Sequence, residues 1–289
     1  MTRVQLTDEE WEFIGPYLPI GEYGPYPERL RQQFEGVIWR FKTGGQWREM
    51  LQEFGAWSNV SKRFHQWRDA DVFEALCGEG RCRGGEGQVK GGSREEQSGR
   101  DAEAEPEWEE RRRVRRRRKL RLKAALLGRS RGGQTSKIHV AADRKCRPLT
   151  LLLTVGQAAD SPQFIPVPKK IRVRGPVGRP RTRPDAVARG KAYSSRGNRA
   201  YLCKRQIQAV IPEKKDQAAN RKKKGSRGGR PIGHDAELYK ARNTVERLVN
   251  KLKAWRGLAT RYDKTPESYL AGLHLRASMI WIKDLRQST

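Results

Sequence analysis

Long apolar runs are absent from this sequence of 289 residues, and their absence excludes two classes of protein. No apolar stretch approaches the roughly 20 residues that a membrane-spanning helix needs. No apolar signal-peptide core follows Met1 either, because acidic residues begin as early as Asp8. We therefore expect a cytoplasmic protein that has no membrane span.

Acidic residues are scarce relative to basic ones. The chain has 33 aspartate and glutamate residues against 62 lysine and arginine residues, which gives a formal net charge of +29. This charge is far larger than solubility requires, and a polyanionic partner explains it. For a soluble chain that partner is DNA or RNA. A membrane surface is the less favoured alternative, because the sequence has no spanning segment.

Cysteine is too sparse and too scattered to build a disulfide framework or a zinc site. The four cysteines form no C-x-x-C pair, and no histidine lies at zinc-like spacing from them. We expect isolated, reduced thiols at all four positions. They are Cys77, Cys82, Cys146 and Cys203.

Residues 1–77 carry the signals of a small all-α domain. Thr7 and Glu10 form a capping box, which predicts that a helix begins there. A second helix is predicted from about Arg29, and Thr43-Gly44-Gly45 ends it. Ser58 is the predicted N-cap of a third helix.

The third predicted helix has an apolar and a basic face. Its apolar positions face inward and leave Lys62, Arg63 and Arg68 outside. A short fourth helix is predicted from Asp71 to Leu76. A tight glycine turn followed by a basic helix suggests a helix-turn-helix-like DNA-binding domain over residues 1–77. A plain helical dimerisation domain is the alternative. The inward positions are Val60, Phe64 and Trp67.

Residues 78–127 differ abruptly in composition from the rest. Glycine, arginine and glutamate dominate, and Arg111 to Lys123 is almost unbroken positive charge. Such a stretch cannot bury enough apolar surface to fold alone, so we predict disorder or loose helix. One interpretation is a solvated basic tail that binds DNA. The other is the translation of a shifted reading frame, which the sharp boundaries of the segment suggest. Its only aspartate is Asp101.

Residues 128–289 have the pattern of an α/β domain. Two strands are predicted at 137–142 and 148–155. A strand at 186–188, a helix capped by Ser194 or Ser195 and a strand at 207–211 then predict a parallel crossover.

Two further segments follow that crossover. Lys214 to Arg230 is predicted to be a mobile basic loop, and an amphipathic helix is predicted from about Pro266.

The segment from Tyr239 to Lys253 carries the clearest functional pattern. Its polar residues Tyr239, Arg242, Glu246 and Lys253 lie at offsets of 0, 3, 7 and 14. On one helix these positions fall within roughly 60° of one another. Apolar residues form a separate stripe at Val245, Leu248, Val249 and Leu252. Either this is a surface helix supported by charge pairs, or Glu246 binds a metal and the cations beside it hold phosphates.

The same residues carry a resemblance to a known family. The Y-x2-R-x3-E-x6-K pattern resembles the signature of bacterial insertion-sequence transposases with a DDE, ribonuclease H-like core. Near the N-terminus, L-T-D-E-E-W, K-T-G-x-x-W-R and W-S-x-V-x-x-R-F-x-x-W resemble the insertion-sequence-five group. The resemblance implies a mixed sheet flanked by helices over residues 128–289. It also implies a nucleoid-associated protein that binds double-stranded DNA at terminal inverted repeats as a homodimer.

The resemblance implies a catalytic site of two Asp and one Glu that hold two Mg²⁺ ions. Glu246 matches the glutamate, and Lys191, Tyr239, Arg242 and Lys253 match positions at the DNA. The second aspartate is expected directly before K-A-Y-S-S, where Gly190 stands.

The first aspartate belongs to a strand expected within 78–127, where no apolar strand context exists. Asp185 lies five residues before Gly190, ahead of the strand, so it cannot take the place of the second aspartate without rebuilding that strand. Asp143 opens a basic turn and is better interpreted as a hairpin residue than as a substitute ligand.

Three functional hypotheses follow. The first is a transposase that carries out Mg²⁺-dependent cleavage and strand transfer, in a copy whose catalysis is lost or crippled. The second is a non-catalytic basic DNA-binding remnant, and the third is a structural RNA-binding protein. Cleavage of DNA that carries the element's ends separates the first two. Binding that ignores DNA ends favours the third.

Overall fold

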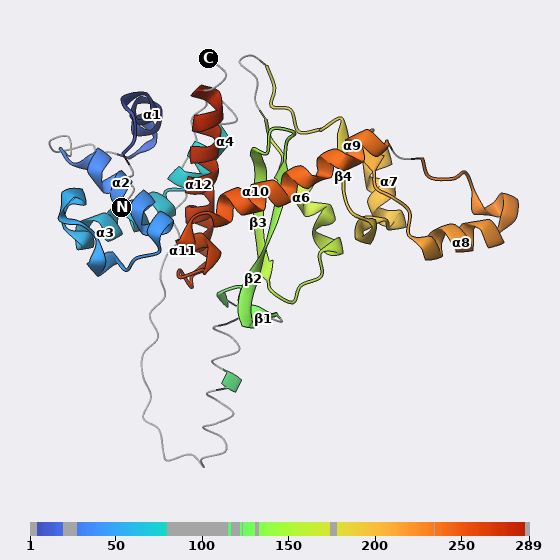
Figure 1. Cartoon of the computed structure of the whole chain (residues 1–289), viewed down its shortest axis with the longest axis horizontal. Coiled ribbons are helices and arrows are strands. Elements are labelled where there is room, and N and C mark those ends of the chain that lie inside the picture. Colours follow the sequence, from blue (N-terminus) through green and yellow to red (C-terminus); the bar gives the residue numbers. More distant parts are fainter. Residues whose placement is uncertain are drawn as a thin grey trace, which may run out of the picture.

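The computed structural model describes residues 5–19, 28–79, 115–116, 122, 124–130, 133–173, 178–233 and 235–286 (Figure 1). Most of the basic block 78–127, including Asp101, lies outside the described residues, so the predictions made for that block stay predictions. No helix in the described part of the chain is long and apolar enough to cross a membrane.

The first two predicted helices are confirmed. Helix α1 (Asp8–Ile14) begins with the predicted capping box, in which Thr7 and Glu10 bond to each other's backbone, and the short turn η1 (Gly15–Tyr17) follows it. Helix α2 (Leu30–Thr43) ends where Gly44 adopts the left-handed conformation, at φ 71°. That conformation favours glycine, which explains why the helix stops there.

The third helix begins earlier than predicted. Helix α3 (Trp57–Asp69) has Ala56, not Ser58, at its N-cap, because the amide of Val60 already bonds to the Ala56 carbonyl. The predicted inward residues are confirmed, since Val60, Phe64 and Trp67 are fully buried. Before it lie the turns η2 (Trp47–Glu49) and η3 (Gln52–Phe54), and after it comes α4 (Val72–Glu79).

One apolar core joins these N-terminal helices to the C-terminal end of the chain. Its members come from α1 to α4, from two strands, and from α10 (Thr244–Lys253), α11 (Arg256–Ala259) and α12 (Pro266–Arg286). Helix α12 is the predicted final helix, and it runs beside α4 near the middle of the molecule (Figure 1). Residues more than 200 positions apart therefore share one packed interior.

The first sheet is antiparallel, with strand order β1-β2-β3. It consists of β1 (Gly128–Ser130), β2 (Gly133–Ala142) and β3 (Pro148–Val155). Strand β3 has the predicted bounds, whereas β2 begins earlier than predicted. Val140 pairs with Leu151 in the centre of the β2–β3 ladder, and both are buried in the shared core.

The second sheet confirms the predicted parallel crossover. Strands β4 (Ala186–Ala188) and β5 (Gln208–Val210) pair in parallel, and α7 (Arg196–Lys204) connects them. Ser195 is the N-cap of α7 and accepts a bond from the Asn198 amide, as predicted. This region also contains two 3₁₀ turns, η4 (Ser161–Phe164) and η5 (Lys191–Tyr193), and the short helix α6 (Pro166–Lys169).

The α/β class is confirmed, but the expected single mixed sheet is not what the described residues form. They form two separate sheets, one antiparallel and one parallel. Residues of β2 and of β4 line a common cavity of about 510 Å³. The ribonuclease H-like arrangement therefore stays an inference.

The prediction of a mobile basic loop at Lys214 to Arg230 is wrong. Residues Lys215–Lys223 form helix α8, and Gly225–Gly228 form the turn η6. Two contacts hold α8: Arg221 pairs with Glu213 at 3.2 Å, and the Gln217 amide donates to the Ser194 carbonyl at 2.7 Å. Helix α8 buries none of its residues and projects from the body of the molecule (Figure 1).

Candidate functional site: a broken signature helix beside a basic cavity

The signature segment is not one continuous helix. Helix α9 (Ala236–Lys240) and α10 are separated by the 3₁₀ turn η7 (Ala241–Asn243). In a 3₁₀ turn, residues three apart lie above one another, and the Arg242 guanidinium accordingly lies 5.0 Å from the centre of the Tyr239 ring. The prediction that Tyr239, Arg242, Glu246 and Lys253 lie on one continuous helix is therefore wrong.

Helix α10 keeps the predicted division between apolar and polar sides. Leu248 and Leu252 are fully buried in the shared core, and Val245 and Val249 pack against it. Glu246 and Lys253 are exposed. The Glu246 carboxylate makes no hydrogen bond or ion pair with any other residue that the structure describes, so it is open to a ligand.

Gly190 lies where β4 ends and η5 begins. Its backbone is extended, at φ −69° and ψ 164°, and its carbonyl accepts the Tyr193 amide. A Cβ atom added at Gly190 would meet only Arg242 Nη1, at 3.6 Å. The fold thus brings together Gly190 and Arg242, two positions that the signature motifs singled out separately.

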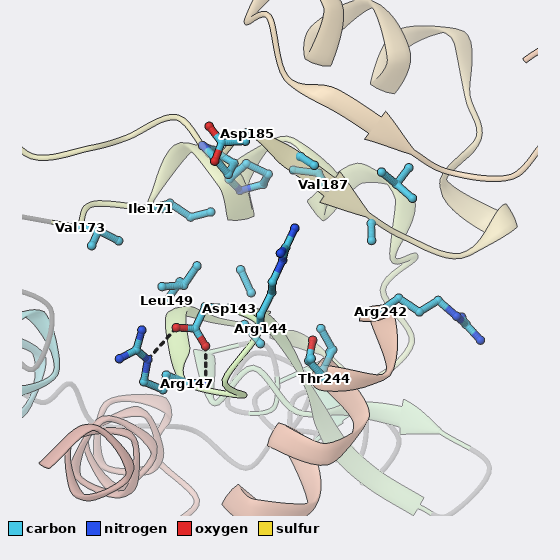
Figure 2. A pocket seen from close by; sticks show the side chains of 18 of the residues that line it. Asp143, Arg144, Arg147, Leu149, Ile171, Val173, Asp185, Val187, Arg242 and Thr244 are labelled. Carbon is cyan, nitrogen blue, oxygen red and sulfur yellow. Dashed lines mark hydrogen bonds and ion pairs between the residues drawn. The ribbon is translucent and has the colours of Figure 1, made fainter. Parts of the chain in front are cut away.

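Two aspartates line the cavity between the sheets, and both are engaged by arginine. Asp143 accepts from the Arg147 side chain at 2.6 Å and from its backbone amide at 2.8 Å (Figure 2). These bonds close the turn between β2 and β3, so Asp143 is a hairpin residue, as predicted. On the opposite wall, Asp185 pairs with Arg181. Both oxygens of Asp143 are taken by Arg147, whereas Asp185 pairs with Arg181 through Oδ1 alone and its side chain is exposed.

Arg189 crosses the space between the two sheets. Its guanidinium donates to the Val140 carbonyl of β2 at 3.2 Å and lies 5.7 Å from the Tyr193 ring centre. Burial lowers the pKa of Arg189 below its ordinary value, although the nearby Tyr193 raises it. Burial also raises the pKa of the Tyr193 phenol. A partly buried guanidinium therefore lies between the two sheets in this part of the site.

The three cations predicted on α3 differ in their surroundings. Lys62 is exposed, and Arg63 contacts only the Gln66 side chain, at 3.5 Å, among the described residues. Arg68 instead pairs with Asp69 at 2.7 Å and donates to Ser268 of α12 at 2.9 Å. Arg68 thus links α3 to α12 through a hydrogen bond. Lys62 and Arg63 have fewer such contacts than Arg68 and are therefore more accessible to a ligand.

Sequence comparison covers both halves of the chain. Residues 6–77 match the family described as "Putative transposase of IS4/5 family", and residues 123–280 match the "Transposase DDE domain". The second match alone spans more than half of the chain. The chain belongs to the DDE transposases of bacterial insertion sequences.

Individual relatives agree with this assignment. The chain is 30% identical over 149 residues to a Brucella ovis protein described as a "Putative transposase for insertion sequence element IS6501", covering 52% of the chain and 99% of that protein. It is 29% identical over 154 residues to the corresponding IS402 protein of Burkholderia cepacia, covering 53% of the chain and 65% of that protein. An uncharacterized Sinorhizobium fredii protein, y4sN, is 26% identical over 73 residues, which are 25% of the chain and 58% of that protein. No solved structure matches the chain.

DDE transposases use a divalent metal, but the described residues of this transposase do not form a site for one. No group of three or more histidine, cysteine, aspartate or glutamate side chains is placed to hold a metal in the described part of the chain. Mg²⁺ is bound chiefly through carboxylate oxygens. Glu246 supplies one carboxylate, and Gly190 supplies none. Among the residues that the structure describes, the donor set therefore does not fit two ions.

Sequence reasoning missed one feature of this transposase. Helix α8 presents the exposed Lys222 and Lys223 on a projecting helix that buries none of its residues. The available signal was the run Asp216-Gln217-Ala218-Ala219, because an early acid and good helix formers favour a helix start. The density of lysine in the segment obscured that signal.

Proposed function

We propose that this transposase binds double-stranded DNA at the terminal inverted repeats of its element and does not catalyse strand transfer. We also propose that it binds DNA as a homodimer through residues 1–77. Residues 128–289 form a ribonuclease H-like core in this proposal. The observation that carries it is Gly190: a glycine, with Arg242 as its only near neighbour, occupies the position where the family resemblance implies an aspartate.

Retained DNA binding is supported by where the cations lie. Lys62, Lys191, Arg242 and Lys253 are all exposed, and α8 adds a projecting basic surface. Exposed lysine and arginine bind the phosphate backbone without needing any metal. The loss of two carboxylates removes ligands for Mg²⁺ and leaves these cations unchanged.

Loss of strand transfer follows from the requirements of the reaction. Displacement at phosphorus by two metal ions needs several carboxylates that hold both ions near the scissile phosphate. A single exposed carboxylate at Glu246 leaves most of the coordination positions to water. DNA is then bound without the electrostatic stabilisation that cleavage requires.

The binding proposal is tested with a labelled duplex that carries the element's ends, measured by fluorescence anisotropy at several salt concentrations. Each phosphate contact releases counterions, so the affinity should fall steeply as salt rises. Replacing Lys222 and Lys223 of α8 by glutamine should weaken binding about tenfold at low salt and reduce the salt slope by about two phosphate contacts. Replacing Lys169 and Lys170 by glutamine is the matched control, since both are exposed lysines that lie outside α8.

Two results would contradict the binding proposal. One is an affinity that barely changes between low and physiological salt. The other is equal weakening by the two lysine pairs, which would mean that only total charge matters. Equal affinity for duplexes with and without the element's ends would favour the third hypothesis, a structural RNA-binding protein.

A further inference from the structure

A cavity of about 650 Å³ lies where the N-terminal helices meet the C-terminal part of the chain. Its lining comes from the end of α2 and the turn after it, and from Arg256 and Tyr262. Helix α11 packs against α2, close to the start of α12 (Figure 1). This cavity shares no lining residue with the one between the two sheets, so it is a separate feature of the molecule.

Two aromatic rings lie against the glycine turn that ends α2. A Cβ atom added at Gly44 would lie 2.6 Å from Cε2 of Tyr262, and one added at Gly45 would lie 2.8 Å from Cη2 of Trp39. Both distances are too short for a real Cβ contact, so glycine lets the rings approach the backbone this closely. Both rings line the cavity, and Tyr262 is 41% exposed.

Two guanidinium groups line the same cavity. The Arg256 side chain is exposed and makes no hydrogen bond or ion pair with any other residue that the structure describes. Arg40 is buried, and its ion pair with Asp263 is long, at 3.5 Å. Arginine is well suited to bind phosphate, and Arg256 is accessible for that role.

Aromatic rings beside an accessible arginine are suited to an unpaired nucleotide. A base that is not paired in a double helix stacks on aromatic side chains, and basic side chains bind its phosphate. A cavity of several hundred Å³ holds a ligand about the size of one nucleotide. A paired duplex, by contrast, presents only its backbone and the edges of its bases in the grooves.

Glu49 adds a group that can distinguish between bases. Its Oε2 accepts the Gln46 amide at 2.8 Å at the start of η2, and the side chain lines the cavity. A carboxylate accepts hydrogen bonds and cannot donate them. It therefore suits a base that carries an exocyclic amino group, such as guanine, better than thymine, which has none.

We propose that this cavity binds one unpaired nucleotide of a DNA strand, with the base stacked on Trp39 and Tyr262 and the phosphate bound by Arg256. Glu49 selects a base that carries an amino group. The inference rests on the proposed DNA binding and names a form of DNA that the chain recognises. A free nucleotide has the same chemistry, but a net charge of +29 favours a nucleotide that belongs to a polyanionic strand.

The test uses the full chain and three labelled duplexes that differ at one position. One carries a single unpaired guanine, the second carries an abasic residue at that position, and the third is fully paired. The first two have the same number of phosphates, so the difference in their affinities reports the base alone. In fluorescence anisotropy the guanine duplex should bind at least about fivefold more tightly than the abasic duplex, because its base stacks on the rings.

Protein variants locate the stacking. Tyr262→Ala should remove most of the preference for the guanine duplex over the abasic duplex. Trp57→Ala is the matched control, because Trp57 is 42% exposed, lies 5.7 Å from the Arg48 guanidinium and does not line the cavity. It should leave the preference unchanged, even if it weakens the binding of both duplexes. Circular dichroism shows whether both variants fold.

A Glu49→Gln variant tests the choice of base. Glutamine keeps the capping box of η2, since it serves at that position as glutamate does. The native chain should bind unpaired guanine about fivefold more tightly than unpaired thymine, because guanine donates a hydrogen bond to the carboxylate. The variant should lose most of this difference. An unchanged difference would overturn the role proposed for Glu49.

A fluorescent base gives a second measurement that leaves the protein unchanged. The emission of 2-aminopurine falls when it stacks on an aromatic ring, and this base also carries an amino group. Placed at the unpaired position, it should lose emission when the native chain binds. This measurement decides where Tyr262→Ala does not fold, and unchanged emission on binding would overturn the proposal.

Three further outcomes would overturn the proposal. They are equal affinity for the guanine and abasic duplexes, equal effects of Tyr262→Ala and Trp57→Ala on the preference, and displacement of the guanine duplex by an equal concentration of guanosine monophosphate. The last would show that the cavity takes a free nucleotide. If none of the three duplexes binds, the DNA-binding proposal fails and this one fails with it, whereas equal binding of the first two overturns this one alone.

Discussion

At the scale of single residues, Gly190 is the position where one side chain would alter the chemistry of the site most. Its extended backbone is open to any residue, and the added Cβ would clear all neighbours except Arg242 Nη1 at 3.6 Å. We expect Gly190→Asp to fold normally and to pair with Arg242. Because that arginine is exposed, the free energy of unfolding should rise by less than about 1 kcal/mol, measured by denaturant titration.

Gly233→Asp is the matched control for this substitution. It makes the same change of charge at a position where an added Cβ also meets nothing. If Arg242 is the partner, adding Arg242→Gln should remove the gain at Gly190 and leave the Gly233 variant unaffected. A marked destabilisation by Gly190→Asp would contradict the open geometry described for this position.

His139 allows a second test at the scale of single residues, because it should make the stability of the fold depend on pH. The ring lies on β2 beside Asp160, Lys137 and Arg189, and its Nε2 contacts Thr154 Oγ1 at 2.8 Å. Burial is the main cause that lowers the pKa of His139. The charge of Asp160 raises this pKa, and the charges of Lys137 and Arg189 lower it further.

The sign of the pH effect follows from that lowered pKa. Below about pH 6.5 the unfolded chain binds more protons than the folded one, so stability falls as the pH falls. His139→Gln keeps a polar atom near Thr154 and should reduce this pH dependence, measured as the free energy of unfolding between pH 7.5 and 5.5. An unchanged pH profile in the variant would show that His139 is not its source.

At the scale of elements, α7 depends on its cap. The Ser195 hydroxyl accepts the Asn198 amide at 3.2 Å at the start of this helix, directly after Lys191–Tyr193. Ser195→Ala should cost about 1 kcal/mol of unfolding free energy, because one backbone donor loses its partner. Ser195→Asp should retain the stability, whereas equal loss in both variants would mean that the hydroxyl does not act as a cap.

Capped elements are the part of the fold that could be predicted from sequence. Thr7 and Gly44 mark helix ends through local bonds and backbone preferences and were predicted in place, and Ser195 was one of two predicted caps. The predicted cap at Ser58 was wrong. The signature segment and α8 could not be predicted in the same way. Helix α8 is held partly by the contact of Gln217 with Ser194, 23 residues earlier, and local periodicity does not mark the 3₁₀ turn at Ala241–Asn243.

At the scale of the whole molecule, the junction between the N-terminal helices and α12 is tight. A Cβ added at Gly272 would lie 2.3 Å from the Phe41 ring, which is fully buried. Gly272→Ala should therefore lower the free energy of unfolding by about 1–3 kcal/mol, since the packed ring has little room to move. Circular dichroism during denaturant titration measures this.

Gly78→Ala is the control for that substitution. Gly78 lies in α4, beside α12, and an added Cβ there meets nothing. Alanine should hold or raise stability at this position by up to about 1 kcal/mol. Equal effects of the two substitutions would contradict the close packing of Phe41 on α12.

The candidate site was predicted only in part. The sequence alone identified Glu246, Gly190 and Arg242, because each stands in a short motif. It did not reveal that Arg242 lies beside Gly190, nor that Arg189 crosses to β2, because both contacts link segments about 50 residues apart. Side-chain contacts of this kind depend on the packing of the sheets and not on local periodicity.

The central claim is that DNA binding has been retained without strand transfer, and a nicking assay tests it most directly. A duplex bearing the element's ends is incubated with Mg²⁺ and the native chain, Gly190→Asp or Glu246→Ala, under conditions in which anisotropy shows that the DNA is bound. We expect no nicking by any of the three, because Gly190→Asp restores only one of two missing carboxylates. Nicking by the native chain that Glu246→Ala abolishes would contradict the account, since other carboxylates must then complete an active site around Glu246.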